Sequence, residues 1–232
     1  MTTRTLDRNR HVDIRNLSYP VEVTAKAPRS YTWLRGTVLD QGQEGACVGF
    51  GWSAELSARP SAVAGIDNNF ALTLYHQAQK FDEWAGENYS GSSVLAGAKV
   101  LQKAGYITEY RWCLTIDDLI YALGHQGPVV IGVDWYTGMF NVDKAGFIRP
   151  TGKIEGGHCT LLHGITIVKN ADGTINYLKS SVIGVNSWGV DWGVFGRFRI
   201  ALVDMMVLFQ GGDFAVPMGR KLIPTTSVSS VV

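Results

Sequence analysis

The chain has 232 residues, 46% of them hydrophobic, which is enough for one large domain or two closely packed lobes. Its 21 lysine and arginine residues balance 20 aspartate and glutamate residues, and no basic stripe stands out, so we expect no nucleic acid partner. No stretch approaches the roughly 18 apolar residues of a membrane span and the N-terminus lacks a secretory signal, so we expect no membrane contact and a cytoplasmic or virion-associated location.

The amino-acid composition of the chain changes three times along its length. Composition suggests an N-terminal arm at 1–30, a helical lobe at 31–127, a strand-rich lobe at 128–216 and a C-terminal tail at 217–232. Because the two lobes differ in class, a cleft between them is the expected place for a functional site.

Apolar periodicity and capping residues predict four helices in the first lobe, at 47–58, 69–79, 93–104 and 115–124. The last of them opens on Thr115-Ile116-Asp117-Asp118, which has the form of a capping box. The first contains two glycines, which are poor helix formers, so another element should pack closely against it.

β-Branched and aromatic residues dominate the second lobe. They predict strands at 129–135, 157–168, 174–178, 182–188 and 193–200. Asp172-Gly173 is placed to turn a hairpin. The second lobe is therefore expected to be a mostly antiparallel sheet or barrel.

The three cysteines, Cys47, Cys113 and Cys159, cannot all pair with one another. A low, odd count fits a reducing compartment or a thiol kept free for chemistry better than a disulfide scaffold. Cys47 is the candidate nucleophile because it opens the helix expected at 47–58. Unpaired backbone N–H groups and the positive end of the helix dipole there favour thiolate over thiol. Cys113 is expected to be a small buried hydrophobe.

Acyl transfer by a thiolate also needs a base that can become an acid. His158 and His163 lie five residues apart in an expected strand, so their side chains should face opposite ways. His158 follows two glycines that allow another backbone to come close, which makes it the candidate base. His163 is expected to be a hydrogen-bonded core residue. The same opposition argues against a metal site built from these histidines and Cys159.

Asn186 could orient that base. Its side-chain oxygen can accept a hydrogen bond from one imidazole nitrogen, which aims the other nitrogen at the thiol. Trp188, two residues further along the strand, lies on the same face and could shield this bond from water. Taken alone, the segment would be interpreted as an asparagine turn with two core tryptophans.

Three motifs, in order, resemble the papain-like cysteine peptidases. They are Gln-Gly-x-x-Gly-x-Cys from Gln41, Gly-His before an apolar strand, and Asn-Ser-Trp-Gly-x-x-Trp-Gly from Asn186. The resemblance extends over about residues 33–216 and is most similar to short bacterial and bacteriophage members without a pro-segment. It implies an α+β fold, in which a helical lobe and an antiparallel β-barrel lobe enclose the active-site cleft.

The resemblance also implies roles for individual residues. Cys47 matches the nucleophile, His158 the general base and acid, and Asn186 its orienter. Gln41 matches the glutamine whose amide joins the Cys47 backbone N–H in the oxyanion hole. Trp188 matches the tryptophan that covers the bond between Asn186 and His158.

Two further positions follow from the resemblance, together with one departure from it. Gly91 and Ser92 stand where the family has a glycine-rich segment that pairs with the substrate backbone. Glu44 stands where secreted members often have a cysteine. Its carboxylate would disfavour ionisation of Cys47 unless it points to solvent.

The function implied is that of a cysteine peptidase, which hydrolyses peptide or protein substrates through a thioester and needs no cofactor or metal. One alternative is a weakly active or inactive structural component of a virion or larger assembly, which binds a protein partner through the arm or tail. Another is an amidase or endopeptidase for cell-wall peptides.

Overall fold

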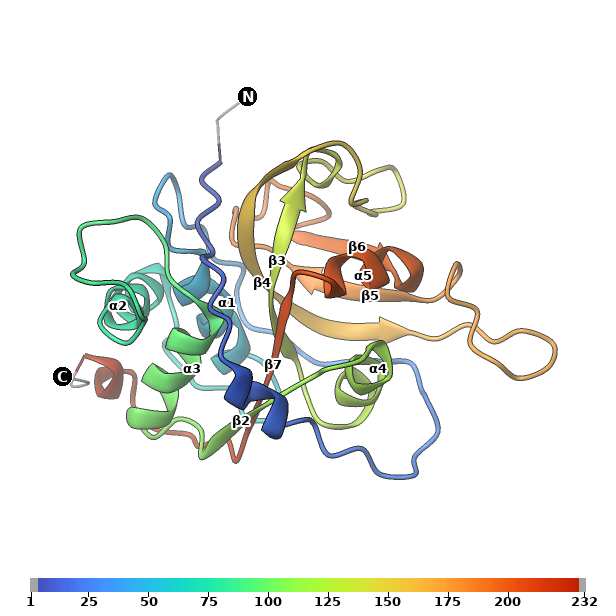
Figure 1. Ribbon diagram of the computed structural model, residues 1–232, viewed down its shortest axis with the longest axis horizontal. Coiled ribbons are helices and arrows are strands. Elements are labelled where there is room, and N and C mark those ends of the chain that lie inside the picture. Colours follow the sequence, from blue (N-terminus) through green and yellow to red (C-terminus); the bar gives the residue numbers. More distant parts are fainter. Residues whose placement is uncertain (1–3, 230–232) are drawn as a thin grey trace.

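A computed structural model describes residues 4–229. Figure 1 shows three helices on one side, a sheet with two more helices on the other, and the N-terminal arm running between them. The helices are α1 (Cys47–Leu56), α2 (Asn68–Gln79), α3 (Val94–Lys103), α4 (Ile116–His125) and α5 (Leu202–Phe209). Short 3-10 helices occur at η1 (Ile14–Ser18), η2 (Thr137–Met139) and η3 (Thr225–Val228). No helix within residues 4–229 is long and apolar enough to cross a lipid bilayer.

The capping residues of the helices explain where most of them begin. Ser93 caps α3 by accepting a hydrogen bond from the backbone N–H of Ala96 at 3.1 Å. The capping box expected before α4 is confirmed, since Thr115 and Asp118 each accept from the other's backbone. Helix α1 has no side-chain cap, and nearly all of its residues are buried. Its glycines allow this burial, since a Cβ on Gly51 would collide with the sulfur of Cys159.

The sheet has seven antiparallel strands in the order β2-β7-β3-β4-β5-β6, and β1 also pairs with β4. The strands are β1 (Tyr31–Thr32), β2 (Glu109–Trp112), β3 (Val129–Tyr136), β4 (Ile154–Thr166), β5 (Ser181–Val185), β6 (Arg197–Ala201) and β7 (Asp213–Met218). The expected barrel is not closed, because β2 and β6 do not pair within the described part of the chain. Residues of the arm pair with the free edge of β2 instead, through hydrogen bonds of 2.9 Å between Val21 and Trp112 and between Trp112 and Tyr19.

Some expected strands differ from those observed. The strand predicted at 174–178 is wrong, because only Ile175 pairs, with Lys169, in a long loop that turns at Gly173. Strands β1, β2 and β7 and helix α5 were not predicted. Strands β1 and β2 have only two and four residues, and β7 lies inside the sheet with four consecutive buried residues, so none of the three has a long alternating pattern.

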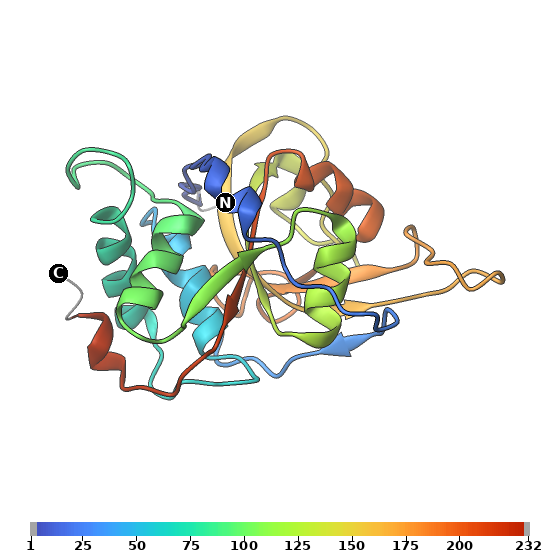
Figure 2. The same ribbon diagram turned by 60° about the horizontal axis from the view of Figure 1, so that its bottom comes forward.

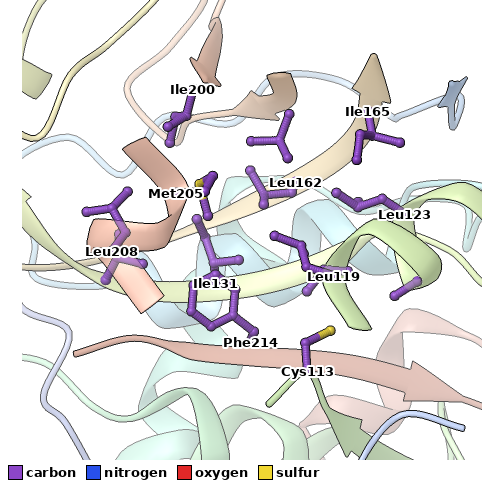
Figure 3. Close-up of a cluster of buried hydrophobic side chains, with 14 of the residues drawn as sticks. Cys113, Leu119, Leu123, Ile131, Leu162, Ile165, Ile200, Met205, Leu208 and Phe214 are labelled. Atoms are coloured by element: carbon purple, nitrogen blue, oxygen red, sulfur yellow. The ribbon is translucent and has the colours of Figure 1, made fainter. Parts of the chain in front are cut away.

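Alternate residues of β3 serve two hydrophobic cores. Val129 and Ile131 pack with α4 and α5 on one face of the sheet, and Figure 3 shows Ile131 in this core. Val130 packs with α1–α3 on the other face. Helix α4 therefore packs against the sheet, although it lies within the helical stretch of the sequence.

A buried ion pair connects α1 to the chain that follows β7. Glu55 is fully buried, and its Oε1 accepts a hydrogen bond from Arg220 Nε at 2.5 Å. Beyond Arg220, η3 lies beside α2 (Figure 2), and its Val228 is buried among the helices. The start of the C-terminal segment is thus held against the helical side.

Replacing Glu55 with alanine is expected to lower the free energy of unfolding by about 3–5 kcal/mol, because Arg220 would remain buried without its partner. Urea denaturation followed by tryptophan fluorescence measures the change. Glu109→Ala removes a half-exposed carboxylate from its pair with Arg111 and is the matched control, with an expected loss below about 1 kcal/mol. Equal losses in the two variants would contradict the importance of the buried pair.

Candidate functional site

Cys47 is the first residue of α1, where the helix meets β4. Its side chain is fully buried. As the first helical residue it has a backbone N–H that no residue of the helix accepts. The backbone N–H of Cys159, the neighbour of His158, lies at its sulfur. The close approach of β4 at Gly51 brings the segment that contains His158 and Cys159 against α1.

His158 and Asn186 are joined by a buried hydrogen bond. The imidazole Nε2 lies 2.8 Å from Asn186 Oδ1, while Nδ1 has no partner among the described residues. Asn186 Oδ1 also accepts from the backbone N–H of Ser187 at 2.8 Å, which fixes the orientation of the amide. Because this oxygen can only accept, Nε2 carries the proton and Nδ1 is free to accept one.

Aromatic rings enclose this hydrogen bond. Trp188 stacks on the imidazole of His158 with ring centroids 4.8 Å apart, and Trp135 meets the same ring edge-on at 4.8 Å. Phe140 in turn stacks on Trp188, with ring centroids 5.8 Å apart. The rings hold the imidazole in place and keep it away from water.

Gln41 ties the loop before Cys47 to the segment after Asn186. Its Oε1 accepts from Ser187 Oγ at 2.6 Å, and its Nε2 donates to the carbonyl oxygen of Glu44 at 2.8 Å. The second Nε2 hydrogen remains available for a ligand. The side chain of Glu44 is exposed and lies 3.6 Å from the imidazole of His76, so it points away from Cys47.

The N-terminal arm passes between the helices and the sheet (Figure 1) and contacts the segments around the site. Arg8 donates its backbone N–H to the carbonyl oxygen of Gly157 at 2.8 Å, and Asp7 accepts from the backbone N–H of Ser92 at 3.3 Å. Gly91 has φ +92°, and a Cβ there would collide with the carbonyl oxygen of Asp7. A Cβ at Gly157 would collide with Arg8 in the same way, so the expectation that a backbone comes close beside His158 is confirmed.

The covered site holds Cys47 and His158 in their neutral forms. Burial raises the pKa of Cys47 to about 11, against the backbone N–H groups of Cys159 and Asp7. Burial lowers the pKa of His158 to about 4, against the effect of the hydrogen bond that its Nε2 donates to Asn186. The sequence predicted a stabilised thiolate at the helix N-terminus. The structure differs because loss of water under the arm outweighs the N–H groups.

Two contributors at this site were not predicted, the arm residue Arg8 and the ring of Trp135. Neither has a sequence signal, since Arg8 lies in a non-periodic segment and the position of Trp135 depends on the register of β3 against β4. His163 lies apart from the site, with its Nδ1 3.1 Å from the carbonyl oxygen of Trp33. It is buried and hydrogen-bonded, as expected of a core histidine.

The sequence is similar to known cysteine proteases. The family described as papain family cysteine protease matches residues 71–206, an interval that contains His158 and Asn186 and begins after Cys47. Cysteine proteinase 3 of Entamoeba histolytica is 25% identical over 229 residues, which cover 85% of this chain and 70% of that protein.

Two solved structures share the fold. Xylellain, a cysteine protease from Xylella fastidiosa, superposes with a TM-score of 0.65 at 18% identity and covers 95% of this chain and 99% of its own. The bromelain protease from Ananas comosus, solved in complex with the E64 inhibitor, superposes with a TM-score of 0.60 at 18% identity. That match covers 83% of this chain and 99% of the bromelain chain.

Proposed function

The chain belongs to the papain family of cysteine proteases, and we propose that Cys47, His158 and Asn186 carry out its hydrolysis of peptide bonds. The observation that carries this mechanism is the hydrogen bond from His158 Nε2 to Asn186 Oδ1, at 2.8 Å, with Nδ1 left unpaired. An imidazole held in this tautomer can accept a proton only at Nδ1.

The reaction begins when a substrate replaces the arm over Cys47. The thiol gives its proton to His158 Nδ1, and the thiolate attacks the carbonyl carbon of the peptide bond. The backbone N–H of Cys47 and the free Nε2 hydrogen of Gln41 stabilise the negative charge on the carbonyl oxygen. This assignment of Gln41 is supported by its anchoring through Ser187 and Glu44.

Collapse of the tetrahedral intermediate breaks the C–N bond, and His158 gives its proton to the departing amine. The acyl group is now a thioester on Cys47. Water then attacks the thioester carbonyl, loses a proton to His158, and releases the carboxylic acid and the regenerated thiol. Trp188 and Trp135, packed on the imidazole, keep water away from the bond that orients it.

Gly91 and Ser92 are candidates for pairing with the substrate backbone. Ser92 hydrogen-bonds to Asp7 and to Asn9 of the arm through its backbone N–H and carbonyl oxygen. A substrate strand that takes the place of the arm finds the same two groups free.

Trapping the thioester tests this mechanism. The protein is mixed with an activated ester of a blocked amino acid, quenched in acid within seconds, digested, and analysed by mass spectrometry. The acyl mass is expected on Cys47 alone, and its formation should be much slower in His158→Ala. Cys113→Ala serves as the matched thiol control and should acylate like the parent. An adduct on Cys159 instead, or none at all, would overturn the assignment.

A further inference from the structure

A cavity lies on β4, β5 and β6, the part of the sheet that is far from α1–α3 (Figure 1). Its volume is about 380 Å³, and its walls include His163 of β4 and Arg197 and Arg199 of β6. Along β6 the two arginines alternate with Phe198 and Ile200, which are buried in the core (Figure 3). None of the candidate catalytic residues lines this space, which we call the β6 cavity.

His163 lines the β6 cavity with a buried ring that has one unpaired nitrogen. The side chain is 3% exposed, and its Nδ1 lies 3.1 Å from the carbonyl oxygen of Trp33. Because a carbonyl oxygen can only accept, Nδ1 carries the proton and Nε2 is an acceptor. No described residue donates to Nε2. A buried acceptor without a partner is costly, so a ligand that donates a hydrogen bond here would be favoured.

The arginines of the cavity have no acidic partner. Neither Arg197 nor Arg199 forms an ion pair within residues 4–229, and Arg197 Nε donates to the carbonyl oxygen of Val194 at 3.1 Å. Burial lowers the pKa of Arg35, and the charge of Arg197 lowers it further, so these two cations are close enough to repel each other. An anion in the cavity would relieve this repulsion.

The carboxylate of the adjacent loop is already engaged. This loop pairs with β6 through Phe147 and Arg199, and it carries Asp143. The Oδ1 of Asp143 accepts from the backbone N–H groups of Ala145 at 2.8 Å and Phe147 at 2.9 Å. Its Oδ2 lies 3.9 Å from Arg149. Asp143 therefore stabilises its own turn and leaves the arginines of the cavity without a counter-ion.

The imidazole of His163 is neutral at ordinary pH. Burial lowers its pKa to about 4, against the hydrogen bond to Trp33, and the charges of Arg35 and Arg197 lower it further. The charged groups that face the ring from neighbouring elements are thus cations, Arg35 from the segment after β1 and Arg197 and Arg199 from β6. Nε2 remains an acceptor among positive charges.

This combination of cationic donors and one neutral acceptor distinguishes between similar anions. Sulfate has no hydrogen, so it would place an oxygen lone pair against Nε2. Hydrogen phosphate has a similar size and the same charge, but it also has one hydroxyl that can donate to Nε2 while its other oxygens accept from arginine. A phosphate monoester has lost that hydroxyl at pH 8, because its second pKa is about 6.

We propose that the β6 cavity binds inorganic phosphate in the form of hydrogen phosphate. The hydroxyl donates to His163 Nε2, and the other oxygens accept hydrogen bonds from Arg197 and Arg199. The site only binds the ion, and no bond is made or broken there. Because the candidate catalytic residues take no part, this binding is independent of the proposed hydrolysis.

Titration calorimetry of the full chain at pH 8 and constant ionic strength tests the proposal. The probes are inorganic phosphate, sulfate and phenyl phosphate. Inorganic phosphate is expected to bind about 10- to 100-fold more tightly than either of the others, because it alone satisfies Nε2. At about pH 5.5 phenyl phosphate regains its hydroxyl, so its affinity should approach that of inorganic phosphate.

Variants of the cavity test the individual contacts. Arg199→Gln removes an exposed guanidinium group and should weaken phosphate binding about 10-fold or more. Lys179→Gln is the matched control, because it removes an exposed positive charge from the loop between β4 and β5, outside the cavity walls. It should leave the affinity unchanged. His163→Phe keeps a ring without nitrogen and should make phosphate and sulfate bind alike.

Several outcomes would overturn the proposal. They are equal affinities of phosphate and sulfate for the parent chain, no binding of phosphate at millimolar concentration, and tighter binding of phenyl phosphate than of inorganic phosphate at pH 8. Equal weakening by Arg199→Gln and Lys179→Gln would show general attraction of anions and would also contradict it. If His163→Phe does not fold, the three anions and Arg199→Gln decide the matter without it.

Discussion

Replacing Cys47 with alanine is expected to abolish peptide hydrolysis, with a loss in kcat on the order of 10⁶-fold, because the nucleophile and base of such enzymes act as a unit. The remaining groups cannot substitute for the sulfur. The other two cysteines are buried, and burial raises the pKa of each well above its ordinary value. Hydrolysis of a fluorogenic peptide measures the loss, in the chain as it is and again with Arg8→Ala.

The control for this prediction is Cys113→Ala. Cys113 packs in the core between the sheet and α4 (Figure 3), so its removal takes away a thiol without touching the site. Cys113→Ala should hydrolyse at a rate close to that of the parent chain. Residual hydrolysis by Cys47→Ala at the parent rate would show that another group performs the attack.

Replacing Arg8 with alanine is expected to increase the rate at which iodoacetamide alkylates Cys47 at pH 8, on the order of 100-fold. Arg8 anchors the arm that buries the sulfur, and burial raises the pKa of Cys47 from its ordinary 9.0 to about 11. Returning water to the thiol lowers its pKa towards the ordinary value, so the thiolate fraction at pH 8 rises. Mass spectrometry of the Cys47 peptide over time gives the rate.

The same shift predicts a difference in pH dependence. A thiol whose pKa is raised has less thiolate at every pH below that pKa, and the thiolate fraction grows tenfold with each pH unit. Alkylation in the parent chain should therefore keep rising towards pH 11, whereas in Arg8→Ala it should level off at lower pH. Arg10→Ala is the matched control, because Arg10 is an exposed arginine of the same arm. Equal rates in all three chains would contradict the anchoring role of Arg8.

Both predictions concern Cys47 and its contact with the N-terminal arm. The backbone N–H of the arm residue Asp7 lies at the sulfur of Cys47, so the arm packs directly against the candidate nucleophile. The segment that covers the site is held by a charged side chain in a largely buried pocket.

Motif spacing was sufficient to select the candidate site residues. Cys47 at a helix start, a histidine after two glycines and an asparagine before a tryptophan stand out because each residue type has a local context that suits the proposed chemistry. The core position of His163 agrees with the expectation from the sequence, although β4 has a register shift between Leu162 and Gly164 that interrupts the simple alternation. The capping box at Thr115 was readable because its two hydrogen bonds connect residues only three apart.

The protonation states of the site could not be predicted in this way. The unpaired backbone N–H groups and the helix dipole at the start of α1 favour a thiolate at Cys47. The helix by itself would therefore lower the pKa of this thiol. The pKa of Cys47 is raised by burial among segments that are distant in the sequence, which include Asp7 of the arm and Cys159 of β4. Desolvation is a property of everything that packs around a group, and no short pattern records it.

The sequence by itself determined helices α1–α4, the long strands and the identity of the candidate catalytic residues, because these depend on periodicity and on contacts between near neighbours. Only the tertiary structure decided that the sheet stays open, that Trp135 lies on the imidazole of His158, and that Arg8 fills an acidic pocket beside Cys47. Strand register and the path of a non-periodic arm are selected by long-range packing and charge pairing, so they appear only when the whole chain is folded.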